Sequence, residues 1–445
     1  MSQEWLWASA SDLGRDIGAG VIDPLDLVET YLAAIAAHPL HDRIYARVTR
    51  ERALAEASAA SDRARSGNRH GLLDGVPISW KDLFDSAGTE TEAGSAYLKG
   101  RIPARDATVL ARATGAGLVC LGKTHMSELA FSGLGFNPVT ATPPCVNDEE
   151  AVPGGSSSGA AASVAFGLAA CGIGSDTGGS VRIPSAWNDL VGLKTTVGQL
   201  PTQGVVPLCR SFDSIGPLCR TVEDAAQFLA ILAGRNAAQT SGADLRGRRF
   251  LVLESVGMDD LRPQPRDAFE RAVAGITRAG AKVVRDSVPE VAEAMDLAPC
   301  LFTVEAYAQW KDVIEANPDL MFRQILERFR AGASFAGTQY VQADQRLKEL
   351  RRGYLEKTAG YDAVIVPTSP VLPPNIERLA VDQDYYVSEN LLALRNTRIG
   401  NLMGLCALSL PTGVPSCGLM LLAAPFSEGR LLRLGGAVEA ALGVG

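Results

Sequence analysis

The chain has 445 residues, 47% of them hydrophobic, which is ample for a large buried core, and its formal net charge is −8. This acidic balance argues against a protein that binds nucleic acid through a basic face. The eight cysteines form no C-x-x-C pair, which argues against zinc knuckles and thioredoxin chemistry and leaves buried free thiols as the expectation.

Helices and strands alternate along the chain. Asp23 followed by Pro24 predicts the N-cap and first turn of a helix. Further helices are predicted over about residues 50–65, 107–116, 158–170 and 265–279, with a mainly helical, charged stretch over 303–358. Strands are predicted over 76–80, 118–121, 250–253, 282–284 and 363–366, and a loop over 235–248. This alternation predicts an α/β architecture.

No targeting or membrane segment is expected. The first 15 residues lack the basic start and the long apolar run of a signal peptide. Residues 154–175 carry no charge, but they consist mainly of Gly, Ser and Ala rather than Leu and Ile, so they do not predict a membrane span. The sequence therefore predicts a cytoplasmic protein.

Residues 154–180 form the most informative stretch, because they are poor in charge and rich in Gly, Ser and Ala. Small residues let backbone N–H groups come close to a substrate. Ser156 lies near the start of the stretch, and Ser180 ends it after the Thr-Gly-Gly run of residues 177–179. A serine preceded by free N–H groups suits acyl transfer, because it combines a nucleophile with an oxyanion hole.

A serine nucleophile needs a base, and Lys81 is the strongest candidate. Of the four histidines only His125 is a plausible alternative, and no G-x-S-x-G elbow supports a Ser-His-Asp triad. A lysine can act instead where burial lowers its pKa toward neutrality. Apolar residues flank Lys81 on both sides, although a lone lysine is usually a surface charge.

Several long motifs follow one another along the chain: GLLDGVPISWKDLF, GKTHMSELAFSG, PGGSSSG, SDTGGSVRIPSA, VGLKTT, SFDSIGPLCRTVEDA and NLMGLCALSLPTG. In this order and spacing they resemble the amidase signature family of serine hydrolases over nearly the whole chain. Ser180 follows Ser156 by 24 residues, as the family pattern requires.

The resemblance implies one α/β domain over residues 1–445, with a mixed twisted sheet surrounded by helices. A signature core would cover about residues 70–225, and a more variable, largely helical substrate-side region about 290–400. No metal or cofactor is implied. The substrate would be a small-molecule amide, and a homodimer is a common state in such families.

The resemblance also implies a Ser-cisSer-Lys triad. Ser180 would attack the amide carbonyl, Ser156 would bridge from a cis peptide after Gly155, and Lys81 would be the ultimate base. An acyl-enzyme on Ser180 would then be hydrolysed to the acid, after release of ammonia or an amine. The oxyanion would be held by backbone N–H groups of Thr177, Gly178, Gly179 and Ser180.

Three neighbouring residues have open roles. Asp176 would order the Gly loop by accepting N–H bonds, or stand in a plain turn. Ser157 would support the bridging serine or cap the following helix. Arg182 would organise the site, meet an acidic substrate group or form a structural salt bridge.

The chain also departs from the family pattern. Trp187, Asn188 and Asp189 replace a commoner aromatic-Cys-Gly run, and His125 occupies a position often held by Asn. These departures leave the shape of the pocket, and therefore the substrate, open.

Other functions stay open at this point. The chain could be the glutaminase or amidase component of a tRNA-dependent amidotransferase, although SVRIPSAW lacks the Gln usual in such components. A non-catalytic binding or scaffold protein is less consistent with an intact lysine and serine set. Residues 117–124 match the Walker A pattern formally, but their Leu-Val-Cys-Leu run predicts a buried strand rather than a phosphate loop.

Overall fold

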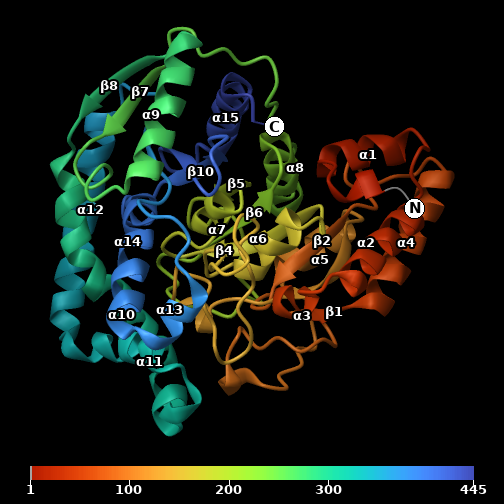
Figure 1. Ribbon diagram of the computed structural model, residues 1–445, viewed down its shortest axis with the longest axis horizontal. Helices are drawn as coiled ribbons and strands as arrows, with labels where there is room; N and C mark the ends of the chain where they lie inside the picture. The colour runs from red at the N-terminus through yellow and green to blue at the C-terminus, as the bar shows by residue number, and fades with distance from the viewer. Residues whose placement is uncertain (1–2, 445) are drawn as a thin grey trace.

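A mixed sheet of eleven strands forms the centre of the protein in the computed structural model, which describes residues 3–444 (Figure 1). The strand order is β1-β3-β2-β4-β6-β5-β10-β11-β9-β7-β8. The strands are β1 (Tyr45–Val48), β2 (Pro77–Lys81), β3 (Val119–Thr124), β4 (Cys171–Asp176), β5 (Val191–Lys194), β6 (Ser214–Cys219), β7 (Arg249–Leu253), β8 (Lys282–Asp286), β9 (Ala363–Pro367), β10 (Cys406–Pro411) and β11 (Gly418–Ala423).

The sheet contains two parallel sections joined by antiparallel strands. β2 pairs in parallel with both β3 and β4, and β7 pairs in parallel with both β8 and β9. The pairs between these sections, and the β1–β3 pair at one edge, are antiparallel. The mixed α/β sheet expected from the sequence is therefore confirmed.

Helices surround the sheet (Figure 1). α1, α2 and α4 lie near the β1 edge, whereas α9 and α12 lie near β7 and β8. The helices are α1 (Ala10–Gly18), α2 (Pro24–Ala37), α3 (His41–Ile44), α4 (Arg50–Arg65), α5 (Thr108–Gly115), α6 (Ser158–Ala165), α7 (Arg182–Trp187), α8 (Val222–Ala233), α9 (Pro263–Arg278), α10 (Pro289–Ala316), α11 (Arg323–Arg330), α12 (Gly337–Thr358), α13 (Ile376–Val381), α14 (Gln383–Leu402) and α15 (Glu428–Leu442).

Local signals in the sequence place several of these elements correctly. The Asp23 side chain accepts a hydrogen bond from Leu25 N and caps α2, which has Pro24 in its first turn. One prediction is too long, because α6 ends at Ala165 rather than near residue 170. Gly167, with a φ of 72°, follows the end of this helix in a conformation that an L residue rarely adopts.

The Walker A match at residues 117–124 is not a phosphate loop. Gly122, Lys123 and Thr124 belong to β3, which is buried along its whole length. Lys123 Nζ donates to Asp82 Oδ1 at 3.2 Å, so its charge is already paired inside the protein.

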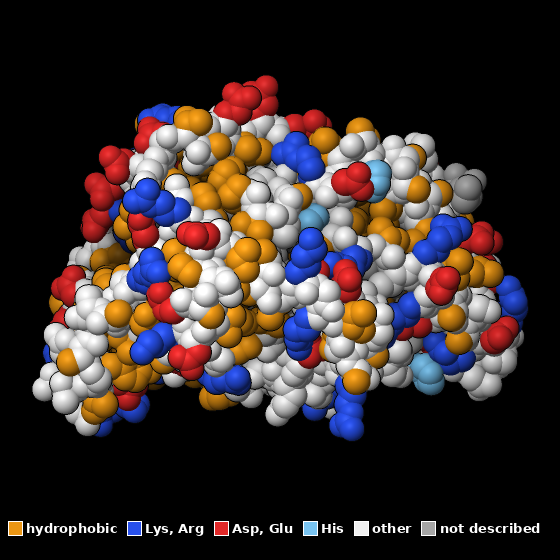
Figure 2. Space-filling model, turned by 90° about the horizontal axis from the view of Figure 1, so that it is seen from below, with side chains coloured by type: hydrophobic (Ala, Val, Ile, Leu, Met, Phe, Trp, Pro, Cys, Tyr) orange, Lys and Arg blue, Asp and Glu red, His pale blue; other side chains and the backbone are white. Residues whose placement is uncertain are grey.

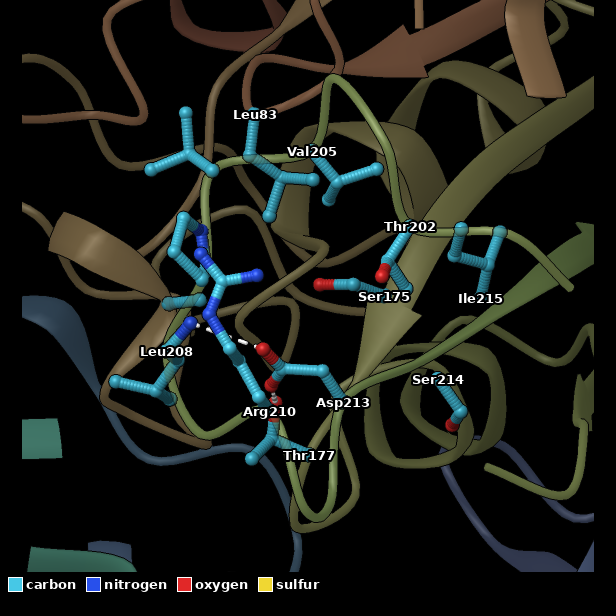
Figure 3. A pocket seen from close by; sticks show the side chains of 13 residues that line it. Leu83, Ser175, Thr177, Thr202, Val205, Leu208, Arg210, Asp213, Ser214 and Ile215 are labelled. Carbon is cyan, nitrogen blue, oxygen red and sulfur yellow. Dashed lines mark hydrogen bonds between the residues drawn. The ribbon is translucent and has the colours of Figure 1, made fainter. Parts of the chain in front are cut away.

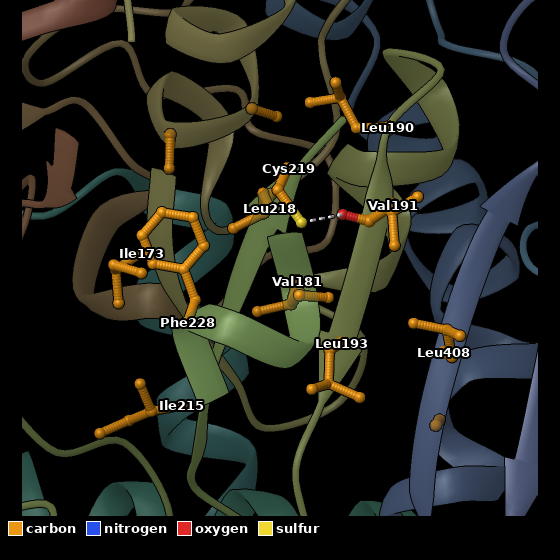
Figure 4. Packing of buried hydrophobic residues seen from close by; sticks show 14 of the residues in the cluster. Ile173, Val181, Leu190, Val191, Leu193, Ile215, Leu218, Cys219, Phe228 and Leu408 are labelled. Atoms are coloured by element: carbon orange, nitrogen blue, oxygen red, sulfur yellow. Dashed lines mark hydrogen bonds between the residues drawn. The ribbon is translucent and has the colours of Figure 1, made fainter. Parts of the chain in front are cut away.

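The central strands meet in an apolar core between β4, β5, β6 and α8. Figure 4 shows Ile173, Leu193 and Leu218 from these three strands together with Phe228 of α8. Cys219 lies in the same core and donates its thiol to the carbonyl of Val191 at 3.8 Å. All eight cysteines of the chain are buried and free.

The surface carries charges of both signs. On the face shown in Figure 2, Lys and Arg side chains are interspersed with Asp and Glu side chains. Within residues 3–444, no helix combines the length and the apolar character that crossing a membrane requires.

Candidate active site

Lys81 is the last residue of β2 and is fully buried. Its Nζ donates hydrogen bonds to Ser156 Oγ at 2.7 Å and to Ser175 Oγ at 2.8 Å. Ser175 belongs to the neighbouring parallel strand β4. Because parallel strands end at the same edge of a sheet, β2 and β4 bring these groups together.

Burial sets the protonation of this lysine. It lowers the pKa of Lys81 to about 7, although the charges of Asp176 and Asp213 act in the opposite direction. Because the usual value is 10.5, a large fraction of Lys81 is neutral near pH 7. A neutral amine within hydrogen-bond distance of a hydroxyl can accept its proton.

Ser156 lies in the loop before α6, and the Gly155–Ser156 peptide is cis, as the resemblance implied. Gly155 N donates to the Gly133 carbonyl at 2.8 Å, and Ser127 N donates to the Ser156 carbonyl at 3.2 Å. A Cβ at Gly155 would lie 2.5 Å from Gly135 N, so only glycine fits this position.

Ser180 lies between β4 and α7 and is 4% exposed. Its carbonyl accepts a hydrogen bond from Ser157 N at 3.2 Å, which joins this loop to the one that carries the bridging serine. Among the hydrogen bonds of residues 3–444, none involves the Ser180 hydroxyl. Ser180 also lines a cavity together with Thr177 and Gly178.

The backbone N–H groups of residues 177–180 are free of hydrogen bonds within the described part of the chain. Gly179 has a φ of 143°, and a Cβ there would lie 2.1 Å from Thr397 Oγ1. Thr397 Oγ1 itself donates to the Gly178 carbonyl at 2.7 Å. The loop is therefore held through its carbonyls, and its N–H groups are available to a ligand.

Asp176 and Arg182 form a buried ion pair behind this loop, with 2.8 Å between Oδ1 and Nη2. Burial would raise the pKa of Asp176, but the charge and hydrogen bonds of Arg182 hold it well below its usual value. Asp176 also accepts hydrogen bonds from Val181 N and from Asn401 Nδ2. Arg182 thus forms the structural salt bridge, one of the three roles left open by the sequence.

Ser157 stands at the N-cap position of α6, but its side chain forms no capping hydrogen bond. Its Oγ donates instead to the Ser175 carbonyl at 3.3 Å. This bond ties the start of α6 to Ser175 of β4, which also accepts a hydrogen bond from Lys81.

Two polar residues of the site were not predicted from the sequence, Ser175 and Asp213. Asp213 accepts hydrogen bonds from Thr177 Oγ1 at 2.5 Å and from Leu208 N at 3.0 Å (Figure 3). Burial raises the pKa of Asp213 to about 6. Both residues lie inside motifs that carry the family resemblance, SDTGGS and SFDSIGP, so that context was the available signal.

Cavities adjoin this cluster. One, shown in Figure 3, has Ser175 and Asp213 in its wall. A second contains Ser180 and shares Phe302, Arg328 and Arg398 with a third of about 270 Å³. The third cavity is therefore adjacent to the one that contains Ser180.

The residues that depart from the family pattern after α7 begins form hydrogen bonds with neighbouring segments of the chain. Trp187 Nε1 donates to the Val371 carbonyl at 3.1 Å, and Asn188 Nδ2 donates to the Pro153 carbonyl at 2.7 Å. Asp189 Oδ1 accepts from Ser416 N at 2.9 Å. These three residues anchor loops around α7.

His125, at the other position that departs from the family pattern, is neutral at pH 7, because burial lowers its pKa to about 4.

No group of three or more His, Cys, Asp or Glu side chains in residues 3–444 is arranged to hold a metal ion. The polar groups that converge are the amine, the hydroxyls and the backbone N–H groups already described.

The chain is similar in sequence to known proteins along most of its length. Residues 26–432 match the model of the Amidase family. The chain is 35% identical to 2-amino-5-chloromuconic acid deaminase of Comamonas testosteroni, with 88% of this chain and 87% of that protein covered. It is 33% identical to a glutamyl-tRNA(Gln) amidotransferase subunit of Anaeromyxobacter sp. (strain K), with 96% of both chains covered.

Among solved structures, the native peptide amidase of Stenotrophomonas maltophilia superposes with a TM-score of 0.85 at 27% identity. The alignment covers 100% of this chain and 98% of that one.

Proposed function

The chain belongs to the amidase signature family and is an amidase, a hydrolase of carbon–nitrogen bonds, and we propose that Lys81, Ser156 and Ser180 carry its reaction. The observation that supports this proposal most directly is the hydrogen bond from the buried Lys81 amine to Ser156. A buried lysine with a pKa near 7, bonded to a serine rather than to a carboxylate, is what a proton relay requires.

In the proposed first half-reaction, neutral Lys81 accepts the proton of the Ser156 hydroxyl while Ser156 takes the proton of Ser180. The Ser180 oxygen forms a bond with the amide carbonyl carbon, and the carbonyl electrons move to oxygen. The relay then reverses, a proton reaches the substrate nitrogen, and the carbon–nitrogen bond breaks. Ammonia or an amine leaves, and the acyl group stays on Ser180.

In the second half-reaction, water attacks the acyl ester and the same groups accept its proton. The carboxylic acid leaves, and the Ser180 hydroxyl is restored.

We assign the oxyanion hole to the N–H groups of Thr177, Gly178, Gly179 and Ser180. The assignment is supported by their freedom from other hydrogen bonds within the described residues and by the loop carbonyls being held from behind. Fixed donors of this kind stabilise the charge that develops on the carbonyl oxygen, and one such donor contributes about 2.7–4 kcal/mol. Asp176 and Arg182 position this loop.

We propose a division of the single domain that spans residues 1–445. The core over about 70–225 would supply the catalytic groups, and the region over about 290–400 would supply contacts with a small-molecule amide. A cytoplasmic location and a homodimer stay predictions of the sequence.

A second candidate is the glutaminase component of an amidotransferase. It is favoured by the 33% identity to a glutamyl-tRNA(Gln) amidotransferase subunit over 96% of both chains. Such a role would require a partner protein, whereas a stand-alone amidase would not.

The experiment that separates the two measures ammonia or amine release by the purified chain. Aliphatic, aryl and amino-acid amides would be compared with glutamine, and Ser180→Ala would be the control. Turnover of a free amide that disappears in Ser180→Ala supports the stand-alone enzyme. Slow release of ammonia from glutamine, and from no other amide, would favour the glutaminase component of an amidotransferase.

A further inference from the structure

The cavity of about 270 Å³ lies among α10, α11 and α14, on the side of the molecule away from α1 and α2 (Figure 1). α10 contacts both α11 and α14. It meets the cavity of Ser180 at Phe302, Arg328 and Arg398. Its size is below the roughly 300–1,000 Å³ of pockets for drug-sized ligands, so it suits a small organic molecule.

Arg328 faces both cavities without a matching carboxylate. It forms no ion pair among residues 3–444, and its Nη1 atom is buried without any hydrogen-bond partner. Its guanidinium stacks over the Phe131 ring, with 4.4 Å between Cζ and the ring centroid. Stacking fixes the plane of the group and leaves its N–H edge free.

Arg398 is the second cation at this junction, and within the described residues it also forms no ion pair or hydrogen bond. Its stem lies beside the catalytic loop, since a Cβ at Gly178 would be 3.8 Å from Arg398 Cγ. Burial, together with the nearby charge of Arg328, lowers the pKa of Arg398 to about 9. The group is therefore still a cation at pH 7.

The nearby carboxylates are engaged elsewhere. Glu327 lines the larger cavity but bonds to Arg323 and Gln383. Asp213 accepts two backbone N–H groups and the Thr177 hydroxyl. Glu128 accepts from the Ser95 hydroxyl and from a backbone N–H. Glu389 pairs with Arg262 through Oε1, and its Oε2 atom is buried without a partner. The two guanidiniums at the junction are thus left without counter-ions from these side chains.

Both guanidiniums are half-buried, and the Arg328 Nη1 atom is fully buried. Cations withdrawn from water without a partner are costly unless a ligand neutralises them. We propose that the substrate amide carries a carboxylate, and that Arg328 and Arg398 bind this carboxylate while the amide carbonyl reaches Ser180. This inference rests on the proposed function, because it places the scissile amide at Ser180. The guanidinium fork matches the two oxygens of a carboxylate, which makes each contact directional as well as charged.

The first test compares amides that differ only in a terminal carboxylate. Malonamic, succinamic and glutaramic acids would be paired with propanamide, butanamide and pentanamide. We expect the best acid amide to exceed its neutral partner in kcat/KM by about 10- to 100-fold, the range of one or two charge-assisted hydrogen bonds. Equal kcat/KM values within each pair would overturn the proposal, as would preference for a phosphonate in place of the carboxylate.

The second test uses Arg398→Gln and Arg328→Gln, with Arg330→Gln as the matched control. Arg330 lies on the same helix as Arg328 but pairs with Glu315 outside the cavity. We expect the two cavity variants to lose about 10-fold or more in kcat/KM for the acid amide, with little loss for the neutral amide. Equal losses for both amides would contradict a role in binding the carboxylate.

A binding measurement separates this inference from the proposed function. Calorimetry would follow succinate binding to Ser180→Ala, which cannot turn over, with and without Arg398→Lys as a charge-retaining variant. Succinate binding that weakens in Arg398→Lys supports the carboxylate site even if no amide is hydrolysed. Reaction of Ser180 with a fluorophosphonate, combined with no succinate binding, would keep the proposed nucleophile and overturn the carboxylate site.

Discussion

Lys81 Nζ lies 2.7 Å from Ser156 Oγ, and both side chains are fully buried. The amine donates to this serine and to Ser175, and within residues 3–444 it forms no ion pair with a carboxylate. Burial therefore dominates its pKa, which is close to 7. This pair links the strand β2 to the loop before α6, and the predictions on catalysis depend on it.

Ser180→Ala is expected to lower kcat by about 10³-fold or more, because it removes the proposed nucleophile. The side chain forms no hydrogen bond among the described residues, so the unfolding free energy should change little. Amide hydrolysis and urea unfolding would both be measured, with the exposed Ser388→Ala as control. Retention of most activity in Ser180→Ala would exclude Ser180 as the nucleophile.

Lys81→Met is expected to lower kcat by about 10³-fold, because general-base catalysis contributes about 10²–10⁴-fold. Methionine has a similar length and no charge to bury, so the fold should persist by circular dichroism. Lys348→Met on the exposed face of α12 is the matched control and should keep full activity. A loss below tenfold in Lys81→Met would mean that another group is the base.

The pH dependence of kcat/KM should follow the titration of Lys81. Its pKa is lowered to about 7, so the protonated form predominates below that pH and cannot accept a proton. We expect kcat/KM to rise about tenfold per pH unit on the acid side and to level above about pH 7 to 8. Measurement between about pH 5 and 9 checks this range. A flat profile would contradict a lysine base with this pKa.

Arg182→Met is expected to destabilise the protein by about 3–5 kcal/mol, because it leaves the buried Asp176 carboxylate without its partner. Urea unfolding measures the loss. Asp176→Asn in the same chain should recover part of it, since the uncompensated charge is then gone. If the double variant is no more stable than Arg182→Met, charge pairing is not the source of the effect.

Gly179→Ala is expected to lower kcat/KM by about 10²-fold, because misplacement of a catalytic loop by about 1 Å has effects of this size. A Cβ there would lie 2.1 Å from Thr397 Oγ1 and must displace the loop. Gly198→Ala is the matched control, since Gly198 also has a positive φ but nothing within 4 Å of the added Cβ. Similar losses of activity in both variants would show that the clash is not responsible.

Part of the proposed catalytic cluster could be predicted because its signals are local. The apolar flanks of Lys81 indicated burial, and burial is what lowers its pKa. The Asp-Pro pair at the start of α2 indicated a cap, and the Asp23 side chain forms it. In both cases the neighbours in sequence are also the neighbours in space.

Other features could not be predicted from local sequence. Strand β4 lies within a stretch rich in Gly, Ser and Ala, which has low strand propensity, and its place comes from pairing with β2 and β6. Arg328 lies in RQILERFR, a segment in which the local sequence does not distinguish it from Arg323 or Arg330. Only the packing of α11 against α10, together with Phe131, distinguishes the arginine that faces the cavity from those that face solvent.

The two parts of the site come from separate stretches of the chain. The proposed relay residues and Asp213 lie between residues 81 and 213, whereas the cavity of about 270 Å³ is lined entirely by residues 298 to 398. Mutations of cavity-facing residues in α10, α11 and α14, other than the part of α14 that holds the Gly178 loop, are therefore expected to change which molecules are accepted while the relay residues keep their geometry. This separation allows the range of accepted substrates to evolve through changes in α10 and α11 alone, and chimeras exchanged at these two helices would test it.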